Sequence, residues 1–362
     1  MIINNINYSL LDLKGDDFHS SLFLQKNKDD EFLSKLGLFY RDFLDTNDTL
    51  TVHTSGSTGK PKNITVKKEF MKNSAYATLK NLNIKNGDCA LLCMPVDFIA
   101  GKMMALRALI GNLNLICITP CKDPLKDLKS DTVIDFIAIT TMQALSILEN
   151  KHSASILSKC KNILIGGGPI DNNLKQRFKD FKGSIYQSYA MTETLSHIAL
   201  LDIKKNDDFY TLFEGISLSL SEHNTAIIHA PMLCDTDIYT NDLIEIIDDR
   251  HFKVLGRIDN VINTGGIKIL IEDLEKFFTG KICCNFAFSK AKHKLYGEQI
   301  ILVIEGCETK ISNKDKKIIQ DIIDKMPRYY VPKHIIYIDK IPLTKTYKVS
   351  RKELEILVSN LI

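Results

Sequence analysis

Short apolar runs alternate with longer amphipathic stretches between residues 88 and 190, and this alternation limits the possible folds more than any other part of the chain. It is typical of β-α-β units, in which each parallel strand is followed by a helix that crosses the sheet. We therefore expect an α/β fold with a largely parallel sheet in this part. The expected strands are 89–94, 114–118, 162–165 and 184–188, and the expected helices are 101–110, 141–149 and 172–181.

A different pattern begins after residue 224. Residues 225–256 contain three short apolar runs joined by turns, which predict a small antiparallel β addition. After Gly256 the pattern starts afresh, with helices near 272–278 and 314–325, strands near 285–289 and 300–304, and a terminal helix. We therefore place a domain boundary near Asp259. It divides a larger N-terminal lobe, residues 1–258, from a smaller α+β C-terminal lobe, residues 259–362.

Composition excludes several classes of protein. With 362 residues, 44% hydrophobic and 25% charged, the chain is typical of globular proteins, and its length favours two units that share a cleft. No apolar run reaches the roughly 18 residues that a membrane helix needs, and no signal-peptide pattern is visible, so we expect no membrane insertion and a cytoplasmic location.

Nine cysteines without a CxxC pair fit reduced thiols. A metal site made of Cys89, Cys93, Cys117 and Cys121 would match no usual zinc spacing.

Charge is distributed unevenly along the chain. Residues 260–362 contain 18 Lys and Arg against 12 Asp and Glu, a formal charge of +6, whereas the whole chain carries +3. This excess forms either a solvated basic face on the smaller lobe or a surface that attracts a polyanionic ligand such as a nucleotide. Nucleic acid is a poorer candidate, because the basic residues are not interleaved with stacking aromatic residues.

Residues 54–62 read Thr-Ser-Gly-Ser-Thr-Gly-Lys-Pro-Lys and follow an apolar run at 50–52. Two glycines let the backbone approach a ligand closely, while four hydroxyls and two lysines can bind phosphate oxygens. The segment is not a Walker A loop, because Pro61 stands where Ser or Thr must follow the lysine. On composition alone, a surface turn is the alternative.

The order of these residues resembles the phosphate-binding signature of the adenylate-forming superfamily, which includes acyl-CoA synthetases, nonribosomal peptide adenylation domains and luciferases. Residues 189–194, Tyr-Ala-Met-Thr-Glu-Thr, are similar to the family's Tyr-Gly-x-Thr-Glu motif, with Ala190 in place of glycine. Four further motifs follow the family's order: 166–169, 239–242, 256–259 with 265–268, and 342–348. The resemblance implies the fold of these enzymes and activation of a carboxylic acid by ATP and Mg²⁺.

By this resemblance, the ATP phosphates are bound by residues at the first motif: Thr54, Ser55, Gly56, Ser57, Thr58, Gly59 and Lys60. Glu193 matches the family's magnesium ligand, beside Thr192, and a carboxylate suits a hard cation that bridges phosphates. Lys348 matches the family's adenylation lysine. It carries positive charge to the α-phosphate, although Tyr347 replaces the glycine that usually precedes it.

The resemblance also implies which residues bind the adenine and ribose of ATP. Gly166, Gly167 and Gly168 would admit the nucleotide at the end of a strand, and Tyr189 would lie against the adenine ring. Asp242 and Arg257 match positions that hold the ribose hydroxyls. Asp259 matches the hinge about which the small lobe rotates between adenylation and thioester formation.

The sequence constrains the identity of the carboxylic acid substrate less than it constrains the nucleotide. The first motif arrives early, as if much of the family's N-terminal region were missing, and the stretch 91–104 most resembles compact o-succinylbenzoate–CoA ligases of menaquinone synthesis. The acyl pocket is then expected around Phe98, Gly101 and Lys102. There Lys102, and less surely Arg107, would meet a second carboxylate. His197 would form a pocket wall or, as the simpler interpretation, a core histidine.

We therefore expect an AMP-forming acid–CoA ligase with ATP, CoA and a small carboxylic acid as its partners. The alternatives are a ligase for another aryl or fatty acid, an enzyme that loads a carrier protein, and a non-catalytic nucleotide-binding protein. A homodimer would cover core surface that a shortened N-terminal region leaves exposed.

Overall fold

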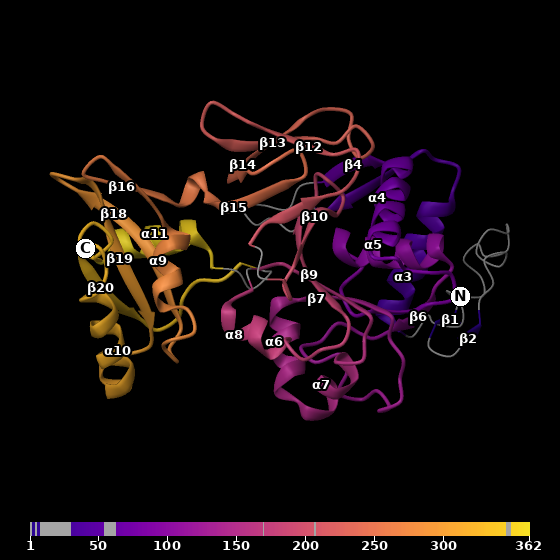
Figure 1. Ribbon diagram of the computed structural model, residues 1–362, viewed down its shortest axis with the longest axis horizontal. Coiled ribbons are helices and arrows are strands. Elements are labelled where there is room, and N and C mark those ends of the chain that lie inside the picture. Colours follow the sequence, from indigo (N-terminus) through magenta and orange to yellow (C-terminus); the bar gives the residue numbers. More distant parts are fainter. Residues whose placement is uncertain are drawn as a thin grey trace.

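The computed structural model describes residues 2–3, 6–7, 30–53, 63–168, 170–205, 208–344 and 349–362. Within them, one long sheet of 13 strands forms the larger body of the molecule (Figure 1). Its strands, in their order across the sheet, are β12 (Ser217–Leu220), β13 (Thr225–His229), β14 (Ile238–Ile246), β15 (His251–Arg257), β11 (Tyr210–Leu212), β10 (His197–Asp202), β9 (Ser184–Ala190), β8 (Asn162–Gly166), β7 (Phe136–Thr140), β5 (Cys89–Leu92), β6 (Asn114–Cys117), β1 (Ile2–Ile3) and β2 (Ile6–Asn7).

The strands from β6 to β9 are parallel, as the alternating pattern predicts. Their side chains alternate between two hydrophobic clusters, so that Ala90 and Leu92 belong to one cluster and Leu91 and Cys93 to the other. Helices therefore cover both faces of the parallel sheet. On one face lie α3 (Glu31–Leu44), α4 (Lys68–Asn81) and α5 (Ile99–Gly111), and on the other α6 (Thr141–Glu149), α7 (Lys151–Leu157) and α8 (Asn172–Arg177).

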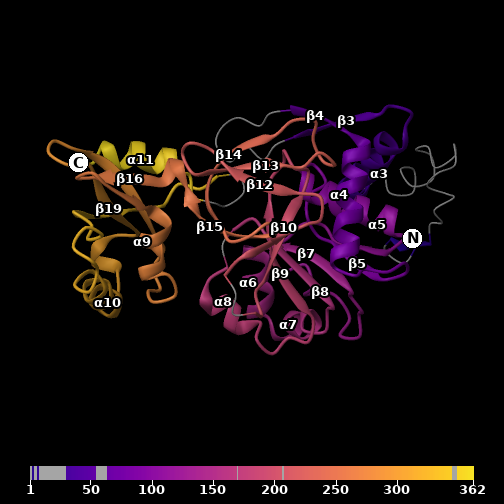
Figure 2. The ribbon, with the colours of Figure 1, turned by 45° about the horizontal axis from the view of Figure 1, so that its top comes forward.

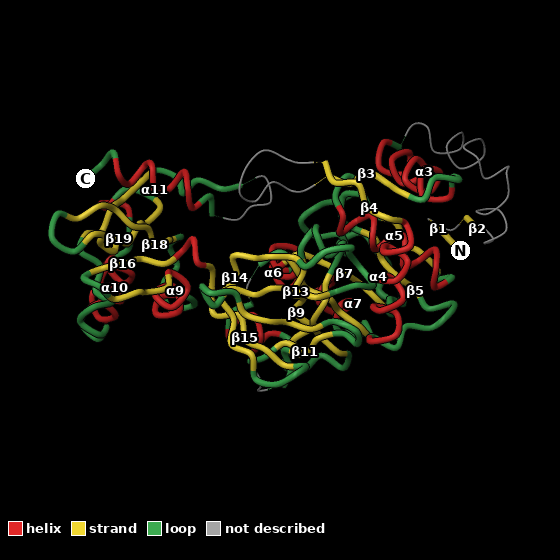
Figure 3. Tube along the Cα trace, turned by 90° about the horizontal axis from the view of Figure 1, so that it is seen from above, coloured by secondary structure: helices red, strands yellow, loops and turns green. Residues whose placement is uncertain are grey.

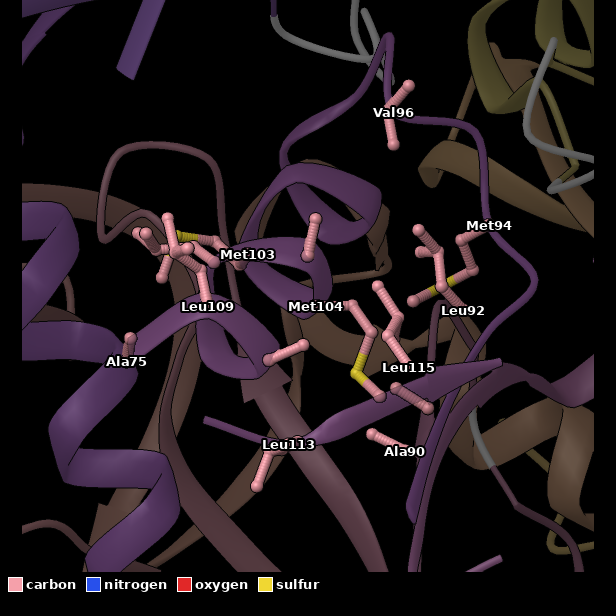
Figure 4. Close-up of a cluster of buried hydrophobic side chains, with 14 of the residues drawn as sticks. Ala75, Ala90, Leu92, Met94, Val96, Met103, Met104, Leu109, Leu113 and Leu115 are labelled. Atoms are coloured by element: carbon pink, nitrogen blue, oxygen red, sulfur yellow. The ribbon is translucent and has the colours of Figure 1, made fainter. Parts of the chain in front are cut away.

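The helix α5 is the most deeply buried part of this layer. Met104 lies against Leu115 and Ala90 of the strands below it (Figure 4). A Cβ atom at Gly101 would stand 2.2 Å from the carbonyl oxygen of Pro95, so only glycine permits this close approach at the start of the helix. At the other end Asn112, with φ of 50°, forms a left-handed cap.

The antiparallel half of the sheet begins between β9 and β10 and runs through β11, β15, β14 and β13 to β12. The expected antiparallel addition is therefore continuous with the parallel strands. A separate two-stranded pair, β3 (Thr49–His53) and β4 (Asn63–Lys67), flanks residues 54–62.

Residues after β15 form a second body with its own core (Figures 2 and 3). Its five strands are β17 (Ile267–Leu270), β16 (Val261–Thr264), β19 (Gly297–Glu305), β18 (Phe286–His293) and β20 (His334–Ile338). The helices are α9 (Ile271–Phe278), α10 (Asn313–Ile323) and α11 (Arg351–Ser359), with the short 3-10 helices η1 (Ile258–Asn260) and η2 (Glu308–Lys310). Among the described residues, no helix is long and apolar enough to cross a membrane.

Candidate active site

The expected phosphate-binding residues 54–60 lie outside the described residues. Their surroundings are described, however. His53 pairs with Asn63 and Val52 with Ile64, so the two ends of the segment lie side by side at the end of the β3–β4 pair.

The expected nucleotide turn, Gly166 to Gly168, begins at the carboxyl end of β8. Gly167 has a φ of 85°, a conformation that favours glycine, and a Cβ atom at Gly166 would stand 2.9 Å from Ser188 Oγ. Because β7, β8 and β9 are parallel, their carboxyl ends meet at this edge, where open α/β sheets bind ligands.

Four residues that were predicted as site residues from separate motifs are linked in one hydrogen-bond network. The Tyr189 hydroxyl donates to Asp242 Oδ2 (2.7 Å), and the Arg257 guanidinium donates to Asp242 Oδ1 (3.1 Å) and to Asp259 Oδ2 (3.1 Å). Asn241 Nδ2 also donates to Asp259 Oδ2 (2.9 Å). The register of β14 and β15, which sets Asp242 opposite Arg257, brings the carboxylate and the guanidinium together.

The ring of Tyr189 is only 8% exposed, and its centroid lies 5.2 Å from that of Phe252 and 5.9 Å from that of Tyr210. Burial and the neighbouring Asp242 carboxylate raise the pKa of Tyr189, so its hydroxyl stays protonated and donates. Its contact with adenine remains a prediction.

The turn between β9 and β10 presents Glu193 to solvent. Thr194 and Leu195 are buried, and Leu195 has a left-handed φ of 66°, an uncommon conformation for a leucine. Thr192 is half-buried. An exposed carboxylate in a tight turn suits Mg²⁺, which is commonly held by one or two carboxylates together with substrate phosphates. In the described part of the chain, no group of three or more His, Cys, Asp or Glu side chains could hold a metal ion by itself.

A buried polar chain, which the sequence did not predict as a unit, lies behind this turn. Arg107 of α5 donates to Ser196 Oγ (2.5 Å), which lies 3.1 Å from His197 Nδ1. His197 Nε2 lies 3.0 Å from Thr78 Oγ1, and that hydroxyl donates to the carbonyl of Ser74 (3.1 Å). Since the Thr78 proton is used by that carbonyl, His197 carries its proton on Nε2 and donates to Thr78. Nδ1 then accepts from Ser196, whose oxygen is left to accept from Arg107.

Arg107 is the unusual member of this chain. It is 2% exposed, no carboxylate among the described residues pairs with it, and its Nε has no hydrogen-bond partner there. Burial lowers the pKa of its guanidinium to about 9, which leaves it charged at neutral pH. A buried charge without a counter-ion is strongly unfavourable unless a ligand supplies one.

The pH dependence of stability provides a test of whether His197 is buried in its neutral form. Burial, and in second place the positive charge of Arg107, lower the pKa of His197 well below its ordinary 6.5. The folded state then binds fewer protons than the unfolded state below about pH 6.5, so stability falls as pH falls. Compared with His197→Gln, the wild type should lose up to about 1.4 kcal/mol of unfolding free energy per pH unit there, measured by thermal unfolding from pH 7 to 5. Parallel pH curves would contradict the assignment.

Lys102 lies elsewhere on α5. Its ammonium group is 5.3 Å from the ring centroid of Phe39 in α3, beside a small opening of about 180 Å³ that Asp42 and Asp97 also line. It precedes Arg107 by five positions, which sets the two side chains about 140° apart around the helix. Phe98 is partly exposed at the N-terminus of α5. The structure therefore brings Arg107, and not Lys102, to Ser196.

Lys348 also lies outside the described residues, but both of its flanks are described. Leu343 and Val349 form an antiparallel bridge, and the Ser350 amide donates to the Pro342 carbonyl (2.8 Å). Arg351 then anchors α11 to the small lobe through a bidentate pair with Glu275, in which both distances are 2.8 Å. The described residues on the two sides of Lys348 are therefore joined to each other.

Several known proteins are similar to this chain in sequence or in fold. The sequence model described as AMP-binding enzyme matches residues 13–216. The 2-succinylbenzoate–CoA ligase of Bacillus cytotoxicus is 22% identical over 339 residues, which cover 85% of this chain and 69% of that protein. An acyl-CoA synthetase (AMP-forming)/AMP-acid ligase II-like protein from Dyadobacter fermentans is 31% identical, with 90% of this chain and 94% of that chain covered and a TM-score of 0.61. The O-succinylbenzoate coenzyme A synthetase of Bacillus subtilis, solved with ATP and magnesium ion, has a TM-score of 0.70 at 19% identity, over 84% of this chain and 69% of that chain, and so shares its fold.

Proposed function

The chain belongs to the AMP-binding enzyme family, and we propose that it is an AMP-forming acid–CoA ligase for an acid with a second carboxylate, most specifically o-succinylbenzoate. The observation that carries the choice of acid is Arg107, a buried cation with no carboxylate partner among the described residues. A monocarboxylic fatty acid would leave that charge uncompensated, whereas a dicarboxylic acid supplies the missing anion.

In the first half-reaction, an oxygen of the acid's reacting carboxylate attacks the α-phosphorus of ATP, and pyrophosphate leaves. The proposed roles follow from charge: residues 54–60 hold the phosphates, and Lys348 stabilises the charge that develops at the α-phosphate. Mg²⁺ shared between the phosphates and Glu193 would offset their negative charge. In the second half-reaction, the CoA thiol attacks the acyl carbon and AMP leaves.

The polar chain behind Ser196 supports the selection of the acid. His197 uses both ring nitrogens to fix the Ser196 hydroxyl, and Ser196 in turn fixes one nitrogen of Arg107. Apart from that bond, the guanidinium has no hydrogen-bond partner among the described residues, and we propose that its remaining donors meet the distal carboxylate as a preoriented fork. Because the chain is buried, the ion pair formed there is only weakly screened by water.

We also propose that residues 259–362 form a mobile lobe that turns about Asp259, while residues 1–258 hold ATP and the acid. Two observations support this hinge. The cores of the two parts share no residue. Asp259 is tied to Arg257 and Asn241 by exposed hydrogen bonds, which water can replace during rotation.

The proposal is tested by measuring pyrophosphate release with ATP and Mg²⁺ over a panel of acids, followed by addition of CoA. The panel contains o-succinylbenzoate, benzoate, medium-chain fatty acids and amino acids. We expect release with o-succinylbenzoate and a thioester once CoA is present. Release with a different acid would keep the ligase and reject the proposed substrate. Pyrophosphate release without formation of a thioester would favour a carrier protein as the acceptor. If no acid gives pyrophosphate release although ATP still binds, a non-catalytic nucleotide-binding protein would be favoured.

A further inference from the structure

A serine, a histidine and an aspartate meet at one end of the large sheet, and none of them is among the residues expected to bind ATP or the acid. The hydroxyl oxygen of Ser219 in β12 lies 2.7 Å from Nε2 of His229 in β13. Nδ1 of the same ring lies 2.8 Å from Oδ1 of Asp237, which immediately precedes β14. The strands β12, β13 and β14 are neighbours at this end of the sheet (Figure 1).

The partners of His229 fix the direction of both hydrogen bonds. A carboxylate accepts, so His229 donates its Nδ1 proton to Asp237. Nε2 of the neutral ring then carries a lone pair, and the Ser219 hydroxyl donates to it. His229 is therefore placed to act as a base toward Ser219, and Asp237 holds the ring and stabilises the imidazolium that proton transfer creates. A nucleophile, a base and an orienting group in this relation form the geometric signature of serine hydrolases.

This Ser–His–Asp cluster is accessible from solvent and adjoins an apolar surface. The side chain of His229 is 34% exposed and that of Asp237 is 51% exposed. Ser219 lies opposite Ile227, which lies opposite Tyr239, and residues directly opposite one another share a face of a sheet. Tyr239 is 74% exposed and Ile227 is half-buried. The face that carries the Ser219 hydroxyl therefore also offers an apolar surface for the acyl group of an uncharged ester.

The backbone beside Ser219 supplies a hydrogen-bond donor. The Ser221 amide donates to the Thr225 carbonyl (2.9 Å), so by the alternation of an antiparallel ladder the Ser219 amide also points toward β13. The Leu220 amide between them then points away from β13, to an edge at which no other described strand pairs with β12. In α/β-hydrolases the amide that follows the nucleophile stabilises the oxyanion of the tetrahedral intermediate, and Leu220 stands in that position.

We propose that Ser219, His229 and Asp237 form a second catalytic site, which hydrolyses esters of small apolar carboxylic acids. Ser219 Oγ attacks the ester carbonyl carbon while its proton passes to His229 Nε2. The ester C–O bond then breaks, and His229 gives that proton to the departing alcohol. Water attacks the acyl-serine next, its proton passes through His229 to Ser219 Oγ, and the carboxylic acid leaves. The net reaction converts an ester and water into an acid and an alcohol, and it uses no step of the proposed ligase reaction.

The test measures hydrolysis of p-nitrophenyl acetate and p-nitrophenyl benzoate by the full chain without ATP or CoA. Ser219→Ala and His229→Gln should each lower kcat/KM by about 10²-fold or more, because either change removes the acyl-serine route. The double variant should be no slower than the single variants, since the two residues act as a unit.

Two variants serve as matched controls and should leave hydrolysis unchanged. Ser217→Ala removes an exposed hydroxyl two residues earlier, on the same face of β12. His251→Gln removes a histidine that is exposed to a similar extent, 32%, and that also pairs with an aspartate, Asp248, at 2.8 Å. Equal hydrolysis by the wild type and Ser219→Ala would overturn the inference, because an exposed imidazole or thiol would then account for the activity.

A covalent label tests the nucleophile without any variant. A fluorophosphonate forms a phosphorus–oxygen bond with a serine that a base activates, and fluoride leaves. Peptide mass spectrometry of the labelled wild type should find the adduct on Ser219, and its absence there would overturn the inference. Pyrophosphate release from acid and ATP should be the same in Ser219→Ala and the wild type, so either proposal can fail while the other stands. Loss of pyrophosphate release in Ser219→Ala would place this serine in the ligase reaction and overturn a separate site.

Discussion

Replacing Lys348 with alanine should slow acyl-adenylate formation by about 10²- to 10³-fold, while thioester formation from supplied acyl-adenylate stays within a few-fold of the wild type. A fixed cation beside the α-phosphate acts only while charge develops there, so its removal affects the first half-reaction alone. Pyrophosphate release measures the first step, and CoA consumption with supplied acyl-adenylate measures the second.

The control for Lys348→Ala is Lys352→Ala, which removes an exposed charge four residues further on, in α11. It should leave both steps unchanged. An equal loss of both steps in the Lys348 variant would contradict a lobe that uses different faces for the two half-reactions. It would indicate instead that the lysine stabilises the fold or holds ATP throughout.

The parallel half of the sheet could be predicted from the sequence because both of its faces are buried. Continuous apolar runs such as 89–94 then stand out between amphipathic helices. The strand β7 and the helix α4 were not predicted from the sequence, although β7 is largely apolar and lies within the alternating region. The sequence also did not predict that the antiparallel strands continue the parallel sheet. The pairing of β9 with β10 that joins them depends on contacts that no local sequence pattern indicates.

The candidate site divides in the same way. Motif order nominated Tyr189, Asp242, Arg257 and Asp259, and strand register brings them together. The chain from Arg107 to Thr78 could not be predicted, because α4, α5 and β10 are far apart in sequence. One signal was available: Arg107 stands in the apolar half of α5, whose neighbouring residues from Met103 to Leu109 are all buried. Lys102, the other residue expected to meet a second carboxylate, lies about 140° from Arg107 around the same helix.

Replacing Arg107 with methionine should reduce kcat/KM for o-succinylbenzoate by about 10²-fold, mainly through KM, and should leave simple aryl or fatty acids unaffected or improved. The expected loss corresponds to about 2.7 kcal/mol, the size of a charge-assisted pair in a desolvated site. Methionine fills much of the same volume, so the change removes the charge and leaves the packing largely intact.

Stability distinguishes this role from a structural one. If Arg107 served the fold, its removal would lower the melting temperature. If Arg107 instead binds the ligand, its charge has no carboxylate partner among the described residues and destabilises the ligand-free protein. The Arg107→Met variant should therefore melt at or above the wild-type temperature. Addition of o-succinylbenzoate should raise the melting temperature of the wild type and not that of the variant.

Arg107→Lys completes the comparison, because it keeps the charge and loses the planar fork. It should recover part of the activity of Arg107→Met toward o-succinylbenzoate. A lower melting temperature for Arg107→Met, together with equal losses for all acids, would show that Arg107 supports the fold and would remove the reason for a dicarboxylic substrate. Selective loss with unchanged or raised stability would instead assign the unpaired charge on α5 to the acid.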